Sequence, residues 1–304
     1  MTVELFGARL TDVGDLPVHR ALPTHGRRTI GAWCFLDHFG PVEVGAGRSM
    51  EVGPHPHIGL QTVTWLLAGQ ALHTDSLGNE QMIRPGQVNL MTAGRGIAHA
   101  EDGRSQQSGA MEGIQFWVAQ PEATRHGPPD FAHHPELPSR SVGQVRITVL
   151  LGEFDGLSSP ARTGSPLLGL DIVGSGDLSL PADARFEYGV VVMHGAVGVG
   201  PFMVRPDTLA SLGSGHQELH LQLAPDTRLI VLGGEPLGEE IVMWWNFVGR
   251  SRDELAQARA EWQAGSERFG VVDSTLPRTP APVPFWLPGP PEGADTGHPG
   301  PSAP

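Results

Sequence analysis

Short apolar segments, interrupted at regular intervals by turn residues, dominate this chain and restrict the folds open to it. The sequence contains 41 glycines and 28 prolines, which favours tight turns over long helices. The strand-like segments are QTVTWLLA, QVNLMTAG, GIQFWVAQ, VRITVLLGEF, YGVVVMHG and ELHLQLAPDTRLIVLGG. Because this spacing is typical of sandwiches and barrels, we predict an all-β protein.

The length of 304 residues is enough for two domains, each with its own core. Residues 121–144 lack apolar periodicity, so we predict a linker there, between a domain of residues 1–120 and a second of residues 145–276. A loose internal repeat supports this division, because a strand end, an Arg-Pro pair and a glycine turn recur in both halves.

The C-terminal part contains the one persuasive helix signal. Ser251 and Glu254 have the spacing of a capping box, and apolar residues then recur at helical intervals, which predicts a helix over residues 251–263 as part of the second domain. Residues 277–304 form a proline-rich tail. We expect the tail to lie extended on the surface, anchored by Phe285 and Trp286, with its last dozen residues disordered.

Composition and charge exclude several classes of function. The net charge is −13 and all 20 basic residues are arginine, so the chain lacks the basic stripe of a nucleic-acid-binding protein. Absence of lysine rules out Schiff-base chemistry. The single cysteine, Cys34, cannot form an internal disulfide, and we find no signal peptide or membrane span. We therefore expect a soluble cytoplasmic protein, monomeric by default, that does not bind nucleic acid or membranes.

Two pairs of polar residues point to a metal site in the first half. His55 and His57 are separated by one residue, as are His99 and Glu101, and alternate residues of a strand share a face. Two strands facing each other in a small barrel would bring all four side chains together. Three imidazoles and one carboxylate suit Fe(II), Mn(II), Ni(II), Cu(II) or Zn(II) better than Mg or Ca. The glycines on either side of Arg95 would allow the tight turn that delivers the second pair.

The alternative is that such pairs arise by chance, since the chain has 14 histidines. Five further histidines have no partner at ligand spacing and are interpreted as surface or hydrogen-bonded residues: His19, His25, His38, His73 and His126. The pair His133-His134 fails the same-face test and is interpreted as solvated. At the positions of the second half that correspond to His55 and His57 the chain has Pro181 and Asp183. We therefore expect the second domain to hold no metal.

Two longer stretches resemble a known family. HPHIGLQTVTWLLAGQALHTDSLGNEQMIRPGQVNLMTAGRGIAHAE, residues 55–101, is similar to the core of the pirin family in the cupin superfamily, and EEIVMWWNFVGRSRDELAQARAEW resembles that family's C-terminal signature. The resemblance implies two tandem jelly-roll-like cupin barrels with a short C-terminal helix. It also implies one divalent transition metal, Fe(II) before the others, held in the N-terminal barrel by His55, His57, His99 and Glu101.

The chain departs from the family pattern at two positions. Pirins usually have a glutamate that is not a ligand where this chain has Gln61, so the carboxylate role falls to Glu101. Many pirins follow HPH with an arginine, where this chain has Ile58, which removes a cation near the site. The second departure leaves the substrate less defined than the metal site.

The resemblance implies two functions. Some pirins oxidise the flavonol quercetin with O₂ as quercetin 2,3-dioxygenases, which would make Glu101 a ligand or the acceptor of the flavonol hydroxyl proton. Other pirins are transcriptional co-regulators or partners of metabolic enzymes, so the alternative is a non-catalytic protein whose metal controls the binding of a protein partner. A structural zinc site fits poorly, because such sites are usually rich in cysteine. Candidate pocket residues are Trp65, Met91, Gln115, Phe116 and Trp117.

Overall fold

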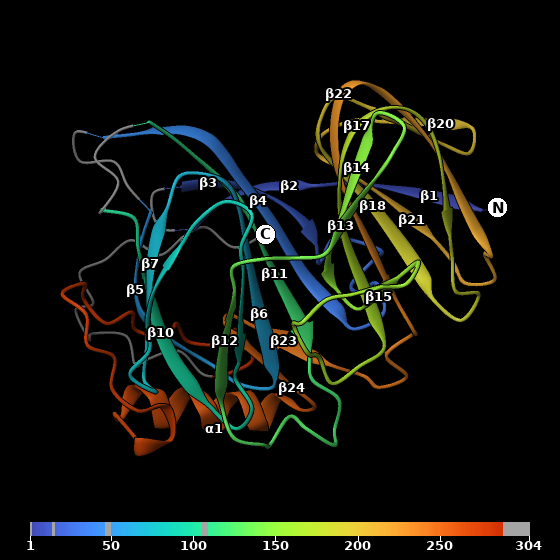
Figure 1. Cartoon of the computed structure of the whole chain (residues 1–304). Helices are drawn as coiled ribbons and strands as arrows, with labels where there is room; N and C mark the ends of the chain where they lie inside the picture. Colours follow the sequence, from blue (N-terminus) through green and yellow to red (C-terminus); the bar gives the residue numbers. More distant parts are fainter. Residues whose placement is uncertain (1, 14–15, 46–49, 105–108, 288–304) are drawn as a thin grey trace.

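The computed structural model describes residues 2–13, 16–45, 50–104 and 109–287. It consists of two β-barrel domains side by side, with a single α-helix against the first (Figure 1). The all-β prediction is confirmed, and each strand segment named from the sequence forms a strand. Among the described residues, no helix has the length and apolar character needed to cross a membrane.

The first domain contains a seven-stranded and a four-stranded antiparallel sheet. The larger sheet has the order β12 (Asp130–His134), β9 (Val88–Thr92), β6 (Leu60–Ala68), β11 (Gly109–Ala119), β4 (Trp33–Val44), β3 (Leu16–Leu22) and β2 (Arg9–Val13). The smaller sheet has the order β5 (Glu51–His57), β10 (Ile97–Asp102), β7 (Ala71–Asp75) and β8 (Glu80–Ile83).

The second domain is built on a nine-stranded antiparallel sheet. Its main path is β1 (Val3–Gly7), β21 (Thr208–Leu212), β18 (Glu187–His194), β22 (Glu218–Gly234), β17 (Leu167–Pro181), β14 (Val145–Leu151) and β13 (Ser139–Val142), with β19 (Val197–Val199) and β20 (Phe202–Val204) beside it. A small hairpin joins β15 (Glu153–Phe154) to β16 (Leu157–Ser158). The interior is filled by apolar side chains such as Ile147, Leu170 and Val190.

Each domain includes a segment from the far end of the chain. The first strand, β1, pairs with β21 of the second domain, and Figure 1 shows its blue ribbon among the yellow strands.

Residues 121–144, predicted to be a linker, instead contribute β12 to the first domain and β13 to the second. These two strands are short and partly exposed, which explains why they carry no clear apolar pattern.

A shared hydrophobic core joins the two domains. Trp33 of β4 is fully buried in it, together with Phe116 of the first domain and Leu232 of the second. The indole Nε1 of Trp33 donates to the carbonyl oxygens of Leu168 (3.2 Å) and Gly233 (3.1 Å), both in the second domain. Burial of large aromatic rings across this boundary stabilises one fixed arrangement of the domains.

The C-terminal segment returns to the first domain, where it forms β23 (Val242–Trp244), β24 (Phe247–Gly249), α1 (Arg252–Gln263) and the 3₁₀ turn η1 (Glu267–Phe269). The helix prediction is confirmed, and Ser251 accepts from the backbone N–H of Glu254 at 3.1 Å. The apolar face of α1 packs on Ile58 and Ala98 of the first domain, although the sequence assigned the helix to the second.

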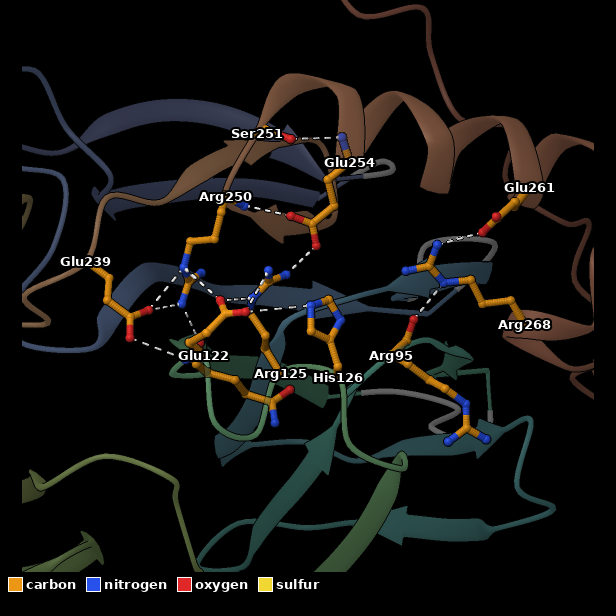
Figure 2. Close-up of polar contacts among 11 residues, drawn as sticks. Arg95, Glu122, Arg125, His126, Glu239, Arg250, Ser251, Glu254, Glu261 and Arg268 are labelled. Carbon is orange, nitrogen blue, oxygen red and sulfur yellow. Dashed lines mark hydrogen bonds and ion pairs between the residues drawn. The ribbon is translucent and has the colours of Figure 1, made fainter.

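Ion pairs attach this segment to the loop that follows β11 (Figure 2). Arg125, 8% exposed, lies between Glu122 and Glu254, with ion pairs to both. The second carboxylate oxygen of Glu254 accepts from the backbone N–H of Arg250 (2.8 Å), whose guanidinium in turn pairs with Glu239. The buried guanidinium thus has carboxylate partners on both sides, as a buried charge requires.

The proline-rich tail is held closely against β5 and α1. The backbone N–H of Thr279 donates to the carbonyl of Pro54 (2.8 Å), and Trp262 Nε1 donates to the carbonyl of Thr279 (2.9 Å). Trp286 packs against Trp244, as expected of an anchor, whereas Phe285 is 82% exposed and is not one. The prediction of disorder for the last dozen residues concerns positions outside the described ranges.

Candidate metal centre

Two adjacent strands deliver the predicted ligands. β5 and β10 pair antiparallel, with His55 opposite His99 and His57 opposite Ile97. Residues opposite each other project from the same face of a sheet, so the three imidazoles share a face. A register shift separates His99 from Glu101. The two pairs therefore lie on neighbouring strands of one sheet, whereas the sequence interpretation set them on strands facing each other across a barrel.

The turn before β10 requires its glycines. Gly94 and Gly96 have φ values of +52° and +159°, and a Cβ added at Gly94 would lie 2.3 Å from the carbonyl oxygen of Gly127. The main chain of Arg95 between them is held from both sides, because its N–H donates to Gly127 (2.9 Å) and its carbonyl accepts from Arg268 Nε (2.7 Å; Figure 2). The tight path predicted from the sequence is present, and contacts from the C-terminal segment fix it.

Three histidines converge at the end of this path. His55, His57 and His99 are 7%, 1% and 2% exposed, and one ring nitrogen from each lies within 4.8 Å of the others. The Nε2 atoms of His57 and His99 are 3.1 Å apart. Such a group of imidazole nitrogens matches the donor set of a mononuclear transition-metal site.

Hydrogen bonds to main-chain carbonyls orient two of these rings. Nδ1 of His55 donates to the carbonyl of Gly53 (2.9 Å) and Nδ1 of His57 to that of Asn246 (3.0 Å). Each neutral ring therefore presents an unprotonated Nε2 to the cluster. Burial lowers the pKa of His55 to about 4 and holds the pKa values of His57 and His99 well below the usual range. At neutral pH all three rings are in the neutral form that binds metals.

Glu101 lines the same cavity as the three histidines but does not belong to the cluster that they form. Its side chain is buried, and its carboxylate oxygens fall outside the group of ligand atoms that are mutually within 4.8 Å. Its Oε1 has no hydrogen-bond partner within the described part of the chain, and burial raises the pKa of the carboxyl group. A buried acid oxygen without a partner is costly, and a cation or a substrate proton would satisfy it.

The cluster forms part of the wall of a cavity of about 530 Å³. Phe35 and Trp117 stack on that wall with ring centroids 4.0 Å apart, and the guanidinium of Arg20 lies over Phe35 at 4.5 Å. Arg20 also makes two hydrogen bonds, of 2.8 and 2.7 Å, with the buried carboxylate of Asp37. The cavity thus combines a flat aromatic face with a few fixed polar groups, as small-molecule sites generally do.

The predicted pocket residues divide into two groups. Gln115 and Trp117 line the cavity, and Gln115 accepts a hydrogen bond from Thr64 (3.0 Å). Trp65 and Phe116 instead pack in the core between the domains, because they occupy the opposite face of their strands. Met91 packs against Phe131, Leu60 and other apolar side chains of the first domain. Alternation along β6 and β11 was the sequence signal that separates these cases.

Several residues of the site were missed by the sequence analysis. Asp37 had a usable signal, since it interrupts an apolar strand in the same way as Gln115. Asn246 and Thr279, which also line the cavity, reach it only through the return of the C-terminal segment, for which no local pattern exists. His73, interpreted as a surface or hydrogen-bonded residue, is 2% exposed and lies 3.3 Å from His99.

Within the described ranges, the group of side chains found at metal-binding distances is His55, His57 and His99 of the first domain. The described residues of the second domain form no comparable cluster. Asp183 is bound to the side chain of Arg185, and His220 is exposed, with contacts to Ser179 and Glu218. The interior of this domain is mostly apolar, and its buried Asp171 is paired with Arg228.

Comparison with known proteins identifies the family. The profile Pirin matches residues 15–118, and the profile Pirin C-terminal cupin domain matches residues 168–270. A Pseudomonas aeruginosa protein named "Putative quercetin 2,3-dioxygenase PA1205" is 48% identical over 283 residues, which cover 92% of this chain and 90% of that protein. The chain belongs to the pirin family. The resemblance in residues 55–101 is thereby confirmed, as are the two cupin domains.

Solved structures agree with this result. A quercetin 2,3-dioxygenase from Acinetobacter baumannii superposes with a TM-score of 0.90 at 40% identity, covering 94% of this chain and 97% of that one. The bacterial pirin YhhW from Escherichia coli, described in complex with nickel(II), has a TM-score of 0.61 at 17% identity and covers 77% of this chain and 100% of its own. At that identity the second likeness shows the fold alone.

Proposed function

We propose that this pirin is a metal-dependent dioxygenase of the quercetin 2,3-dioxygenase type, which oxidises a flavonol with O₂ and releases carbon monoxide. The observation that carries the proposal is the convergence of three buried, neutral histidines on the wall of a cavity of about 530 Å³. That volume lies within the range of about 300–1,000 Å³ typical of small-molecule sites. The names of the relatives at 48% and 40% identity support the reaction class.

The proposed cofactor is one divalent transition metal held by His55, His57 and His99. Fe(II) is our first choice, and Mn, Ni, Cu or Zn also fit a donor set rich in imidazole. When bound, the ion would acidify a coordinated flavonol hydroxyl and promote its reaction with O₂.

Glu101 is proposed to complete the site, as a fourth ligand and as the acceptor of the proton from the flavonol 3-hydroxyl. Its buried Oε1, which has no hydrogen-bond partner among the described residues, supports both roles. Burial raises the pKa of this carboxyl group, which makes it a stronger proton acceptor than an exposed glutamate.

The cavity walls would hold the rings of the substrate. The stacked pair Phe35 and Trp117 offers an aromatic face against which a planar flavonol packs by offset or edge contacts. Arg20, Asp37 and Gln115 supply donors and acceptors for the phenolic hydroxyls.

The test is a reconstitution of the metal-free protein under anaerobic conditions with Fe(II), and separately with Ni(II). Quercetin and then O₂ are added, and loss of flavonol absorbance is followed together with carbon monoxide release. We expect turnover that His99→Ala abolishes. His220→Ala removes an exposed histidine of the second domain and should leave turnover unchanged, which makes it the matched control.

Glu101→Gln separates the two roles of the carboxylate. If Glu101→Gln still binds the metal but no longer turns over, Glu101 acts as the proton acceptor. If the variant no longer binds the metal, Glu101 acts as a ligand. If the protein binds Fe(II), Ni(II), Mn(II) and Cu(II) stoichiometrically and oxidises no flavonol with any of them, the dioxygenase proposal is wrong. The metal-dependent regulator then remains as the alternative.

A cytoplasmic location is part of the same proposal, because the single cysteine, Cys34, is buried and cannot pair within the chain.

A further inference from the structure

Beside the histidine cluster, on the neighbouring strand β7, lies a second row of buried polar side chains, His73 and Asp75. Nδ1 of His99 is 3.3 Å from Nδ1 of His73, and Nε2 of His73 is 3.2 Å from Oδ2 of Asp75. His73 and Asp75 are each 2% exposed, and both come from β7, which pairs with β10. The ring of His73 is fixed by stacking on Phe131, with centroids 4.4 Å apart.

The carboxylate of Asp75 can only accept in this arrangement. Oδ1 accepts from the backbone N–H groups of Leu77 (2.9 Å) and Asn79 (3.1 Å), and the side-chain amide of Asn79 donates to both oxygens. A carboxylate surrounded by N–H donors presents an acceptor to its remaining neighbour. Nε2 of His73 must therefore carry the proton that it shares with Asp75.

The protons along the row can then be assigned one after another. A neutral imidazole has one N–H, so Nδ1 of His73 is an acceptor, and the atom facing it, Nδ1 of His99, must donate. Nε2 of His99 is consequently unprotonated. That atom lies 3.1 Å from Nε2 of His57, inside the proposed metal site.

We propose that Asp75, acting through His73, is the positioning device that fixes His99 in its metal-binding tautomer. This inference rests on the proposed metal site and adds to it two residues that do not line the cavity, of which His73 contacts the ligand His99. His55 and His57 are oriented by main-chain carbonyls, which no substitution removes. The tautomer of His99, by contrast, depends on the side chains of His73 and Asp75, so a substitution there can reverse it.

Asp75→Asn should reverse the direction of the hydrogen bond between residue 75 and His73. The amide oxygen can keep the bonds that Leu77 and Asn79 make to Oδ1, while the amide nitrogen replaces Oδ2 and donates to His73 Nε2. The bond from the Asn79 side chain to Oδ2 is lost in this variant. His73 then carries its proton on Nδ1, and His99 must accept there and become protonated on Nε2. His73→Phe removes the acceptor but keeps an aromatic ring for the stacking on Phe131.

The experiment measures both the tautomers and the metal affinity. Long-range ¹H–¹⁵N correlation spectra of the metal-free full-length chain, with ¹⁵N-labelled histidine, report the protonated nitrogen of each ring. We expect Nδ1–H for His99 and Nε2–H for His73 in the wild type, with both reversed in Asp75→Asn. Competition with a chromophoric chelator should show Ni(II) bound about 10- to 100-fold more weakly by Asp75→Asn and by His73→Phe.

Asp171→Asn is the matched control. Asp171 is a buried aspartate of the second domain, 3% exposed, bound to Arg228 through two hydrogen bonds. Its substitution should lower stability without changing the histidine tautomers or the Ni(II) affinity, so a fall caused only by loosened folding would appear there too.

The proposal is overturned if His73 carries its proton on Nδ1 or on both nitrogens in the wild type. It is also overturned if Asp75→Asn binds Ni(II) as tightly as the wild type, or if Asp171→Asn weakens binding equally. Failure of the wild type itself to bind Ni(II) would count against the proposed metal site. The tautomers of His73 and His99 in the metal-free protein would still test whether Asp75 fixes them.

Discussion

The tail against β5 leads to a sharp prediction at Gly53. A Cβ added there would lie 2.0 Å from the carbonyl oxygen of Pro277, far inside any real contact distance, and the obstacle is main chain that cannot rotate away. The φ angle of Gly53 does not lie in the left-handed region, so alanine at this position meets no backbone strain of its own. Gly53→Ala should therefore act through one event, displacement of the tail.

The cost can be worked out from the contacts that the tail would lose. The three that we count are the bonds from Thr279 N–H to Pro54, from Trp262 Nε1 to Thr279 and from the N–H of Ala281 to Gln263 (2.8 Å). At about 1 kcal/mol each, they sum to about 3 kcal/mol. Exposure of Ala281, now 4% exposed, adds to this loss, and conformational entropy regained by the released residues offsets part of it. We expect the free energy of unfolding to fall by about 2 kcal/mol.

The measurement is urea unfolding of Gly53→Ala, combined with limited proteolysis of the tail in the native protein. Gly213→Ala is the control, because a Cβ at Gly213 meets nothing within 4 Å and its φ is not in the left-handed region. We expect the control to be neutral or slightly stabilised, and the tail of Gly53→Ala to be cleaved faster than that of the wild type. Equal unfolding midpoints and equal cleavage rates for the two variants would show that the tail does not depend on this contact.

Three further predictions address the metal, the pH response and the domain boundary. Free Ni(II) at 100 times its Kd should raise the free energy of unfolding by about 2.7 kcal/mol in the wild type and leave His57→Ala unchanged, as measured by thermal melts with and without chelator. Burial alone would raise the pKa of Glu112, but hydrogen bonds with His38 and His194 hold it below its ordinary value of 4.5. The unfolded chain then binds the proton more readily, so the stabilisation is present above pH 4.5 and is lost as the pH falls through the native pKa. Glu112→Gln should flatten this acid dependence in urea titrations, and an unchanged slope would contradict the assignment. Trp33→Phe should cost about 2 kcal/mol in the same assay, because it removes the donor to two second-domain carbonyls and part of a buried ring, and a loss below about 0.5 kcal/mol would refute it.

The sequence predicted those parts of the molecule whose information is local. Alternation and turn residues located the central strands, the capping box at Ser251 located α1, and the same-face rule brought together His55, His57 and His99. Each of these depends on residues a few positions apart in the chain.

What the sequence did not predict depends on residues that meet only after folding. The main-chain carbonyl of Asn246, which orients His57, carries no side-chain signature and lies 189 positions further along the chain. Trp65 points into the core between the domains and not into the cavity, which depends on how β6 lies in its sheet. The strands within residues 121–144 likewise form only by pairing with β9 and β14. His73 was set aside because only ligand spacing was considered, although Asp75, two residues on, shares its face of β7.

The exchange of terminal segments between the domains has a consequence for synthesis. A ribosome releases β5 and β10 well before Asn246, whose carbonyl orients His57, and the strand that pairs with β21 precedes both of them in the chain. While the second barrel is translated, the first barrel therefore lacks the carbonyl that orients His57. A metal ion that arrived at this stage would find the imidazole of His57 free to rotate. Cutting the gene between the barrels should yield two fragments that each lack a piece of their own wall, so the two halves mature together.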